Sequence, residues 1–468
     1  MPTRTSPRTG RGATLLLCAI VALGLALRIA GAQGGLWLDE AWSAVLAHEA
    51  GTPAGVFLQI NHDNNHHLNS LWLQAVGLGA PSWLMRALSI ATGTLAIPVA
   101  AALARPRGRV AEAVAAILFA TSPMLVTLGS EARGYAPMTL ALLVATLFVD
   151  RTLAGDARYR RPLALRLCFV LGALSQLTMV FGVLALCGWA FFAWWRRESF
   201  GVAVRRSLAL FAGPLVALAA TLALVFGAAW ASPTGFQFGS YEPFSTIMYL
   251  HALVEMVGYT VGWPVVTIAL PVLALVLLVL APRAGASRVA FYRLAIFGFP
   301  VAMAVLQAGN PGHPRYYLLA AVALLLMLGE VIAHGLGRGG RWRVVAGASL
   351  IAIVVGGLVQ DVDLAINRRG DPARAIPALA ARAPKGTTVL MDRATGEAML
   401  RVAAAQAGYP LRIVKAPCPA APFVFADRFK GETLPAMLVR CRTRYLPIAG
   451  AQAHGLSGTH WTLYARAP

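Results

Sequence analysis

The chain has 468 residues, of which 58% are hydrophobic and only 13% are charged, and its mean hydropathy is +0.66. A soluble globular protein is about half apolar and about a quarter charged, so the composition excludes an ordinary soluble domain. The formal net charge of +21 could indicate nucleic-acid binding, but the arginines lie between apolar stretches, as in membrane proteins. The composition therefore predicts a polytopic α-helical membrane protein with no nucleic-acid partner.

Apolar stretches close to the ~20 residues that cross a bilayer recur along the first 360 residues. They lie at about 14–31, 83–104, 110–128, 135–152, 207–229, 263–281, 293–308, 317–335 and 343–360. The stretch 162–195 is too long for one span and is interrupted by Ser175, Gln176 and Thr178, so we interpret it as two spans with a tight turn. About eleven transmembrane helices result, within a range of about ten to thirteen.

The distribution of arginine gives the orientation of these spans. With the N-terminus in the cytoplasm, the Arg-rich connections all fall inside, as the positive-inside rule expects. They are 105–109, 150–161, 196–206, 282–288 and 337–343. The opposite connections contain few basic residues, mainly Arg133 and Arg315. These connections are 32–82, 129–134, 230–262 and 309–316, and the tail after about 361 shares their side. We expect that side to be the periplasmic face of a bacterial inner membrane.

The first outer loop, residues 32–82, is too long for a simple connection, and long ordered loops are usually functional. It contains DEAWSAVLAHEA (39–50) and NHDNNHHLNSLWLQAVG (61–77), both with helical apolar spacing and with Trp residues suited to the membrane interface. We expect two amphipathic helices on the outer surface. AGAQ (30–33) loosely resembles a signal-peptide cleavage site, but the long first span favours a retained helix.

The chain divides at about residue 360 into a transmembrane domain, 1–360, and a tail, 361–468. The tail has short strand-like segments at 387–392, 411–416, 422–427 and 459–465, and helical patterns at about 373–383, 396–407 and 432–440. This alternation predicts a small α/β domain, which could serve as a lid, an acceptor-docking surface or structural support. Cys418 and Cys441 both fall in it, where a disulfide could persist.

Four polar clusters lie at span ends on the outer face: Asp39 with Glu40, and residues 61–67, 130–135 and 312–317. Solvated loop ends explain much of this polarity. They explain Asp39 and Glu40 less well, because four large apolar residues surround the pair, namely Leu36, Trp37, Leu38 and Trp42. Burial and mutual repulsion are expected to raise the pKa of one carboxyl toward the range of a general base.

Arg133 and Arg315 are the rare cations on this face, and a tyrosine follows each within two residues, Tyr135 and Tyr316. The planar guanidinium group suits a phosphate. A carboxylate base with two such groups on a membrane surface predicts chemistry on a phosphate-bearing lipid.

The histidines of the first loop also suggest a metal site. On a helix, His62 and His66 would be four residues apart and share a face, as would Asp63 and His67. No third ligand completes either pair, so a divalent ion and hydrogen-bonding loop histidines both remain open.

Five segments occur in an order that resembles the GT-C membrane glycosyltransferases, in particular the branch of protein O-mannosyltransferases and lipid A aminoarabinose transferases. They are LWLDEAWSA, DNNHHLNSLWL, PSWLMRALS, SPMLVTLGSEARGYAPMTLALL and HPRYYLLA. The resemblance is dense over 35–145, thin over 160–300, and returns at 312–320. It implies an inverting enzyme that moves a hexosyl or pentosyl group from a polyprenyl-phosphate donor to a glycan, lipid or protein acceptor outside the membrane.

The resemblance also implies roles for individual residues. Asp39 becomes the catalytic base, with Glu40 as its support, which could orient a loop group, bind a metal or adjust the pKa of Asp39. Arg133 and, less directly, Arg315 become donor-phosphate ligands. Glu131, Tyr135 and Tyr316 belong to the same donor-binding segments.

The chain departs from the family in the first loop, where the family often has His-Pro-Pro-Leu or His-Pro-Leu-Tyr and this chain has HHLNSLW. His66 or His67 aligns with the family histidine. Some members use a divalent ion near the carboxylate. The alternative function is a transporter or lipid flippase, but such a protein should bury charges deep within its spans and often shows related halves.

Overall fold

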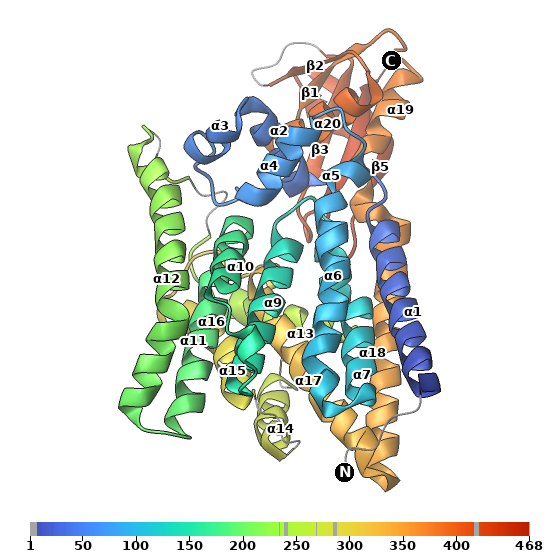
Figure 1. The fold of residues 1–468 in the computed structure, drawn as a ribbon. Coiled ribbons are helices and arrows are strands. Elements are labelled where there is room, and N and C mark those ends of the chain that lie inside the picture. The colour runs from blue at the N-terminus through green and yellow to red at the C-terminus, as the bar shows by residue number, and fades with distance from the viewer. Residues whose placement is uncertain are drawn as a thin grey trace.

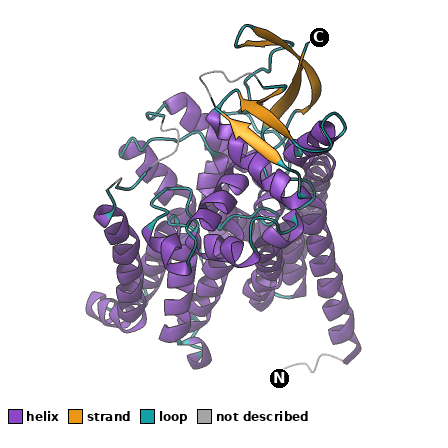
Figure 2. Ribbon diagram, turned by 90° about the horizontal axis from the view of Figure 1, so that it is seen from above, coloured by secondary structure: helices purple, strands orange, loops and turns teal. Residues whose placement is uncertain are grey.

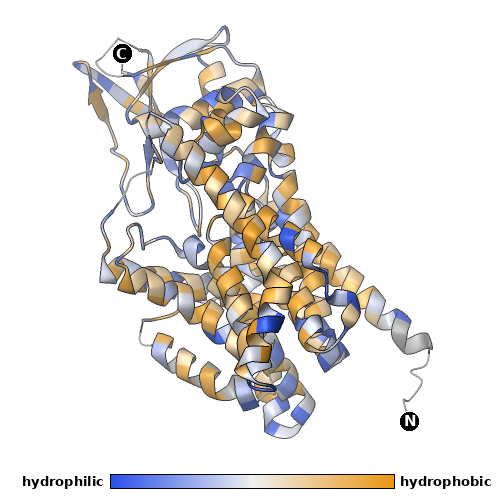
Figure 3. Cartoon of the chain, turned by 60° about the vertical axis from the view of Figure 1, so that its left-hand side comes forward, coloured by the Kyte–Doolittle hydropathy of each residue, from blue (hydrophilic) through white to orange (hydrophobic). Residues whose placement is uncertain are grey.

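The structure is a computed structural model that describes residues 7–467 except 234, 238–241, 268, 284–287 and 416–420. Long helices lie side by side beneath a smaller C-terminal domain with a mixed β-sheet (Figure 1). We call the end of the bundle that carries this domain the sheet-bearing end. The chain is a polytopic helical membrane protein, and Figure 3 shows hydrophobic residues covering much of its helices.

The helices of the bundle have the following bounds: α1 (Pro7–Gly31), α6 (Ala87–Ala104), α7 (Arg109–Thr121), α8 (Pro123–Leu128), α9 (Tyr135–Leu153), α10 (Pro162–Ser175), α11 (Met179–Trp195), α12 (Phe200–Ala231), α13 (Thr246–Val261), α14 (Ala269–Arg283), α15 (Val289–Arg293), α16 (Phe299–Val305), α17 (Leu318–Arg338) and α18 (Gly340–Asn367). A π-helical turn, η3 (Leu294–Gly298), joins α15 to α16, and a 3-10 turn, η4 (Pro314–Tyr317), precedes α17.

Within the described residues, six helices are long and apolar enough to cross a membrane, judged by length and composition. They are Arg11–Gly31, Ala87–Arg107, Tyr135–Leu153, Phe200–Ala231, Pro314–Arg338 and Gly340–Ala380. Four shorter apolar helices accompany them, Pro162–Ser175, Met179–Trp195, Thr246–Val261 and Val289–Val305. Short helices are compatible with a bundle because neighbours and broken segments can satisfy backbone groups at membrane depth.

Sequence reasoning locates most of these helices but not every break. The predicted division of 162–195 is confirmed, since α10 ends at Ser175 and α11 begins at Met179. The predicted span 110–128 is interrupted at Ser122, which is extended (φ −72°, ψ 121°) because the Pro123 ring disfavours a helical residue before it. The segment 230–262, expected to be a loop, contains helix α13, which packs against α8 and α17.

The first outer loop forms four short helices, α2 (Leu38–Glu49), α3 (Pro53–Leu58), α4 (His67–Val76) and α5 (Ser82–Met85). The predicted helix over 39–50 matches α2. The predicted helix over 61–77 is wrong before His67, because residues 61–66 form a loop whose His62 makes a parallel β-bridge to Gln237. Both α2 and α4 lie between the bundle and the C-terminal domain rather than on an open surface (Figure 1).

The C-terminal domain is a six-stranded mixed sheet with two helices, seen from above in Figure 2. Its strands are β1 (Thr387–Met391), β2 (Leu411–Val414), β3 (Phe423–Arg428), β4 (Leu438–Arg440), β5 (Thr443–Ala451) and β6 (His460–Arg466), in the order β2-β1-β3-β6-β5-β4. β1 is parallel to β2 and β3, and the remaining pairs are antiparallel. Its helices are α19 (Ala375–Ala380) and α20 (Glu397–Ala407).

The predicted strands match β1, β2, β3 and β6, and the expectation of a small α/β domain is confirmed. The predicted helix over 432–440 is wrong: Leu438 pairs with Tyr445 across a β4–β5 hairpin. Its two turn residues, Cys441 (φ 55°) and Arg442 (φ 59°), have the positive φ values of a tight hairpin turn. The predicted bridge from Cys441 involves Cys418, which lies outside the described residues.

A second hydrophobic core, separate from that of the bundle, fixes α2 in place. Leu36, Trp37, Leu38 and Ala41 are buried here against residues of α19, α20 and the sheet, including Leu379, Met399 and Trp461. Burying a large apolar side chain stabilises a fold by about 1.5–3 kcal/mol. The start of α2 is therefore held rigidly between the two domains.

Candidate active site at the start of helix α2

Asp39 lies in the first turn of α2 and bridges two arginines from separate segments. Its Oδ2 atom is 2.9 Å from a terminal nitrogen of Arg133 and 2.9 Å from one of Arg315. The Asp39 side chain is 20% exposed, whereas those of Arg133 and Arg315 are 4% and 13% exposed. The structure thus brings together one carboxylate and two guanidinium groups at a partly open position.

Glu40 points away from this position and is fully buried. Arg86 donates to both of its oxygens, at 2.8 and 2.6 Å, and the backbone N–H of Ala132 donates to Oε1 at 2.6 Å. Arg86 also donates to the carbonyl oxygens of Ala32 and Gly35. Glu40 therefore fastens α2 to the preceding turn and to the segment that carries Arg133.

In the segment 129–134, Glu131, Arg133 and Gly134 each make a contact that positions the segment. Glu131 accepts from the hydroxyl of Ser457 and lies 3.5 Å from Arg369, so it ties the segment to the C-terminal domain. Arg133 donates to Asn64 at 2.6 Å as well as contacting Asp39. Gly134 is in close contact with a neighbouring turn, where any Cβ atom would overlap the carbonyl oxygen of Ser175.

Aromatic rings line the arginines. The Arg133 guanidinium lies 5.4 Å from the Tyr135 ring centroid, and that of Arg315 lies 5.4 Å from Trp37 and 5.9 Å from Tyr316. Such cation–π contacts hold a guanidinium in position without neutralising its charge. The two predicted tyrosines therefore lie beside the predicted arginines.

His66 is near this cluster, whereas His67 faces elsewhere. The Nδ1 atom of His66 is 2.9 Å from the Ser175 carbonyl oxygen, which can only accept, so Nδ1 carries the proton. Its ring lies 5.2 Å from Tyr135, and its Nε2 is buried without a hydrogen-bond partner in the described structure. His67 stacks on Phe57 at 5.1 Å. His66 is thus the histidine placed beside the candidate site.

Electrostatics at the site differ from the sequence prediction. Burial alone would raise the pKa of Asp39, but the guanidinium groups of Arg315 and Arg133 outweigh it and hold the pKa below its usual value. At Glu40, burial alone would also raise the pKa, but the charge and hydrogen bonds of Arg86 outweigh it and lower the pKa. The expectation that mutual repulsion raises a pKa within this pair is wrong, because each carboxylate faces its own arginines.

Two other groups near the site are neutral for a different reason. Burial, followed by the charge of Arg133, holds the pKa of His66 well below its usual value. Desolvation by the surrounding protein, followed by the charge of Arg315, lowers the pKa of His313, the residue before η4, to about 4, although part of its side chain is exposed. Both rings are therefore uncharged at neutral pH, and the positive charge around Asp39 comes from the arginines.

The two predicted histidine pairs of the first loop do not come together on a helix face. Because residues 61–66 are not helical, His62 and His66 do not share a helix face; His62 instead lies 2.7 Å from Asp63. Among the residues that the structure describes, no group of three or more His, Cys, Asp or Glu side chains could hold a metal ion. No catalytic step is derived through a metal.

Sequence reasoning missed three contributors to the site. Asn64 accepts from Arg133 and donates to the Asp39 carbonyl oxygen at 3.2 Å, while Ser457 and Arg369 reach Glu131 from the C-terminal part of the chain. Asn64 lies within the polar cluster 61–67, and that cluster could have indicated it. For Ser457 and Arg369 no local pattern exists, because their partner lies more than 200 residues away in the sequence.

Two cavities flank helix α13. One, of about 320 Å³, is lined by apolar residues such as Leu253, Met256 and Leu324, and Tyr249 is at its edge. The Tyr249 ring lies 6.1 Å from that of Tyr317, in the same turn as Arg315. One residue that lines the apolar cavity therefore packs against the turn that carries Arg315.

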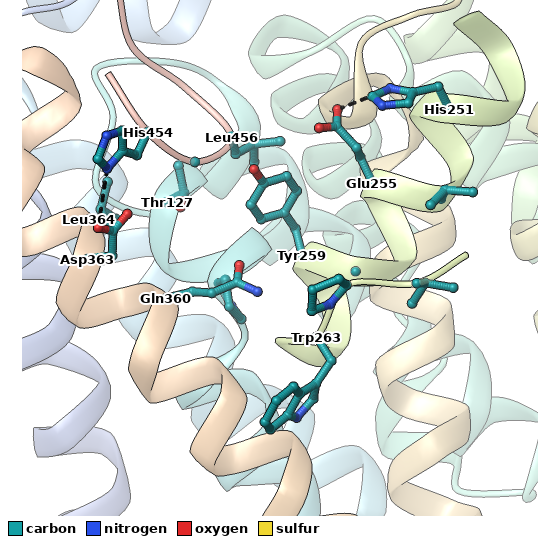
Figure 4. Close-up of a pocket in the computed structure, with 16 residues that line it drawn as sticks. Thr127, His251, Glu255, Tyr259, Trp263, Gln360, Asp363, Leu364, His454 and Leu456 are labelled. Carbon is teal, nitrogen blue, oxygen red and sulfur yellow. Dashed lines mark hydrogen bonds and ion pairs between the residues drawn. The ribbon is translucent and has the colours of Figure 1, made fainter. Parts of the chain in front are cut away.

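The other cavity, of about 430 Å³, lies between α13, α8, α18 and residues 454–456 (Figure 4). Its polar groups face one another: His251 lies 3.8 Å from Glu255, and His454 lies 3.5 Å from Asp363. Because it is lined by residues of both parts of the chain, this cavity lies at the seam between the bundle and the C-terminal domain.

The architecture and the site together define a class, the polytopic membrane proteins with a buried charged cluster beneath a soluble C-terminal domain. Comparison with solved structures makes the fold more specific. The structure of ArnT from Cupriavidus metallidurans in the apo state is 14% identical in sequence, with a TM-score of 0.58 over 97% of this chain and 98% of that one. The same protein bound to undecaprenyl phosphate gives 13% identity and 0.52 over the same shares.

Archaeal oligosaccharyltransferase AglB from Archaeoglobus fulgidus, in complex with an inhibitory peptide and a dolichol-phosphate, is 13% identical, with a TM-score of 0.52 over 90% of this chain and 70% of that one. ArnT and AglB are both GT-C glycosyltransferases. The chain therefore has the GT-C fold, which confirms the fold that the sequence resemblance implied. Neither a family model nor a curated protein sequence matches the chain.

Proposed function

We propose that this protein is an inverting glycosyltransferase that moves a sugar from a polyprenyl-phosphate-linked donor to an acceptor at the sheet-bearing end. The observation that carries the proposal is the position of Asp39, whose carboxylate lies between the guanidinium groups of Arg133 and Arg315 within a GT-C fold. We further propose that the sheet-bearing end faces the periplasm of a bacterium and that the protein resides in the inner membrane.

The site supports a single displacement. Asp39 would take the proton from an acceptor hydroxyl as its oxygen attacks the anomeric carbon. The bond from that carbon to the phosphate oxygen breaks on the opposite face, which inverts the configuration. Polyprenyl phosphate leaves with the bonding electron pair, and Arg133 and Arg315 stabilise its growing charge.

The apolar cavity beside α13 supports a lipid-linked donor. It is lined mainly by hydrocarbon and aromatic side chains, together with Arg293, and one lining residue, Tyr249, packs against Tyr317, two residues after Arg315. A polyprenyl tail in this cavity would bring its phosphate toward the arginines. Two solved proteins of this fold, ArnT and AglB, are bound to undecaprenyl phosphate and to a dolichol-phosphate, which agrees with this donor class.

The acceptor and the sugar are proposed more broadly, as a glycan, lipid or protein hydroxyl and as a hexosyl or pentosyl group. The solved structures of similar fold give no support for the alternative of a transporter or lipid flippase. The decisive experiment incubates the purified protein in lipid nanodiscs with a panel of radiolabelled polyprenyl-phosphate sugars and bacterial envelope fractions. Transfer that requires a donor and is lost in Asp39→Asn supports the proposal, and no transfer from any donor contradicts it.

A further inference from the structure

The two arginines proposed to bind the donor phosphate already hold an anion, which is Asp39 itself. One carboxylate oxygen, Oδ2, receives both guanidinium groups at 2.9 Å. In the described part of the chain, Asp39 is the single ion-pair partner of both Arg133 and Arg315. The Nε atoms of both arginines are buried and have no hydrogen-bond partner among the residues that the structure describes, so each guanidinium has donor capacity that its contacts there leave unused.

This arrangement opposes the chemistry expected of Asp39. A carboxylate that accepts two charge-assisted hydrogen bonds from arginine is stabilised in its ionised form and is a weak base. Burial acts in the opposite direction, favouring the neutral acid. Removing the arginines from Asp39 would leave burial as the dominant influence and make the carboxylate a better proton acceptor.

A phosphate competes well for the same nitrogens. It offers several acceptor oxygens to two planar guanidinium groups, whereas Asp39 offers them one shared oxygen. Asp39 is also the most exposed member of the three side chains, at 20%. It is therefore the member with room to turn away.

We propose that the donor phosphate displaces Asp39 from Arg133 and Arg315, and that this displacement activates Asp39 as the base. The inference rests on the proposed function and adds a regulation to that site. In the donor-free protein, Asp39 occupies the phosphate position and is a poor base. The acceptor hydroxyl can be deprotonated only after the donor has bound, so activation of the base is coupled to donor binding.

The test is equilibrium binding of a polyprenyl phosphate, without sugar, to the full-length protein in nanodiscs. Asp39→Asn removes the competing charge and should bind the probe about tenfold more tightly than the wild type, although the variant is inactive in transfer. Arg133→Ala should bind it more weakly. The matched control is Asp63→Asn, which removes a carboxylate that lies 2.7 Å from His62 and forms no ion pair with Arg133 or Arg315 among the described residues, and it should stay within about twofold of the wild type.

The outcomes separate this inference from the proposed function. Equal or weaker binding by Asp39→Asn overturns the displacement, even if the variant is inactive and the base assignment therefore stands. Equal tightening by Asp63→Asn also overturns it, because general repulsion would then explain the effect. Wild-type transfer by Asp39→Asn removes the base role, and absence of binding by every variant and the wild type refutes the proposed donor and the displacement together.

Discussion

Asp39 and Glu40 are neighbours in the sequence but contact different parts of the molecule. Successive residues on a helix point about 100° apart, so Asp39 reaches Arg133 and Arg315 while Glu40 reaches Arg86 on the other side. The sequence could indicate that Asp39 and the two arginines meet, because all three lie at span ends of one face. The sequence could not indicate that Glu40 pairs with Arg86, because the two residues are 46 positions apart and no local pattern links them.

Substituting Asp39 is expected to affect the chemical step, and it also removes the carboxylate that pairs with Arg133 and Arg315, so the stability of the variant must be measured beside its activity. A general base typically contributes about 10²–10⁴-fold, so Asp39→Asn should lower the turnover of sugar transfer by about that factor. The measurement is transfer rate per mole of purified protein, with thermal stability recorded in parallel. A variant that folds normally and transfers at the wild-type rate would remove Asp39 from the mechanism.

Substituting Glu40 should mainly lower the stability of the fold. Glu40→Gln leaves Arg86 buried with its charge uncompensated, and breaking a buried ion pair in this way costs about 3–5 kcal/mol. We expect a marked drop in the thermal unfolding temperature. Glu49→Gln, at the other end of α2, is the control, because its pair with Arg401 is exposed and worth about 0–1 kcal/mol. Equal unfolding temperatures for both variants would contradict the structural role of Glu40.

At the scale of elements, short segments are positioned by contacts that the local pattern does not contain. The spacing of 61–77 predicted one helix, yet residues 61–66 bond to Gln237 and to Asp39 through Asn64. Strand β5 was missed because its pairing depends on β6 and on the tight turn at Cys441 and Arg442. Long apolar helices were easier to predict, since their length and composition alone separate them from the connections.

The segment 129–134 gives a test at this scale. Gly134→Ala would drive a methyl group into the Ser175 carbonyl oxygen, so the segment must shift and take Arg133 with it. We expect at least tenfold lower transfer and a lower unfolding temperature, because a shift of about 1 Å at a positioning group can cost about 10²-fold. Gly227→Ala in α12 is the control: nothing lies within 4 Å of the added carbon, and alanine favours a helix. An active, stable Gly134→Ala would show that the segment tolerates displacement.

At the scale of the whole molecule, the C-terminal domain supports the site. Arg369 donates to the carbonyl oxygens of Gly31 and Thr127 and to the Ser130 hydroxyl, and it lies beside Glu131. The sequence predicted the two-domain organisation from the loss of apolar runs. It left the role of the tail open among a lid, a docking surface and structural support, and these contacts favour support.

The orientation of the molecule can be tested with a reporter. The Arg-rich connections predict that the C-terminal domain lies outside the cytoplasm. A reporter that is active only in the cytoplasm, fused after residue 468, should therefore show little activity, whereas one active only outside should be strongly active. The same two reporters fused within 196–206 should give the reverse result. High cytoplasmic activity at the C-terminus would place the candidate site on the wrong side for the proposed reaction.

The contacts of Ser457 and Thr459 also bear on how the protein is made. Ser457 bonds Glu131, and the Thr459 hydroxyl accepts from the backbone N–H of Leu38, next to Asp39. Glu131 and Leu38 are thus held by residues more than 300 positions later in the chain, which leave the ribosome after them. During synthesis, the nascent chain inserts its helices long before these contacts can form. A chain translated only as far as residue 456 would therefore lack both contacts, one at the start of α2 and one in the segment 129–134.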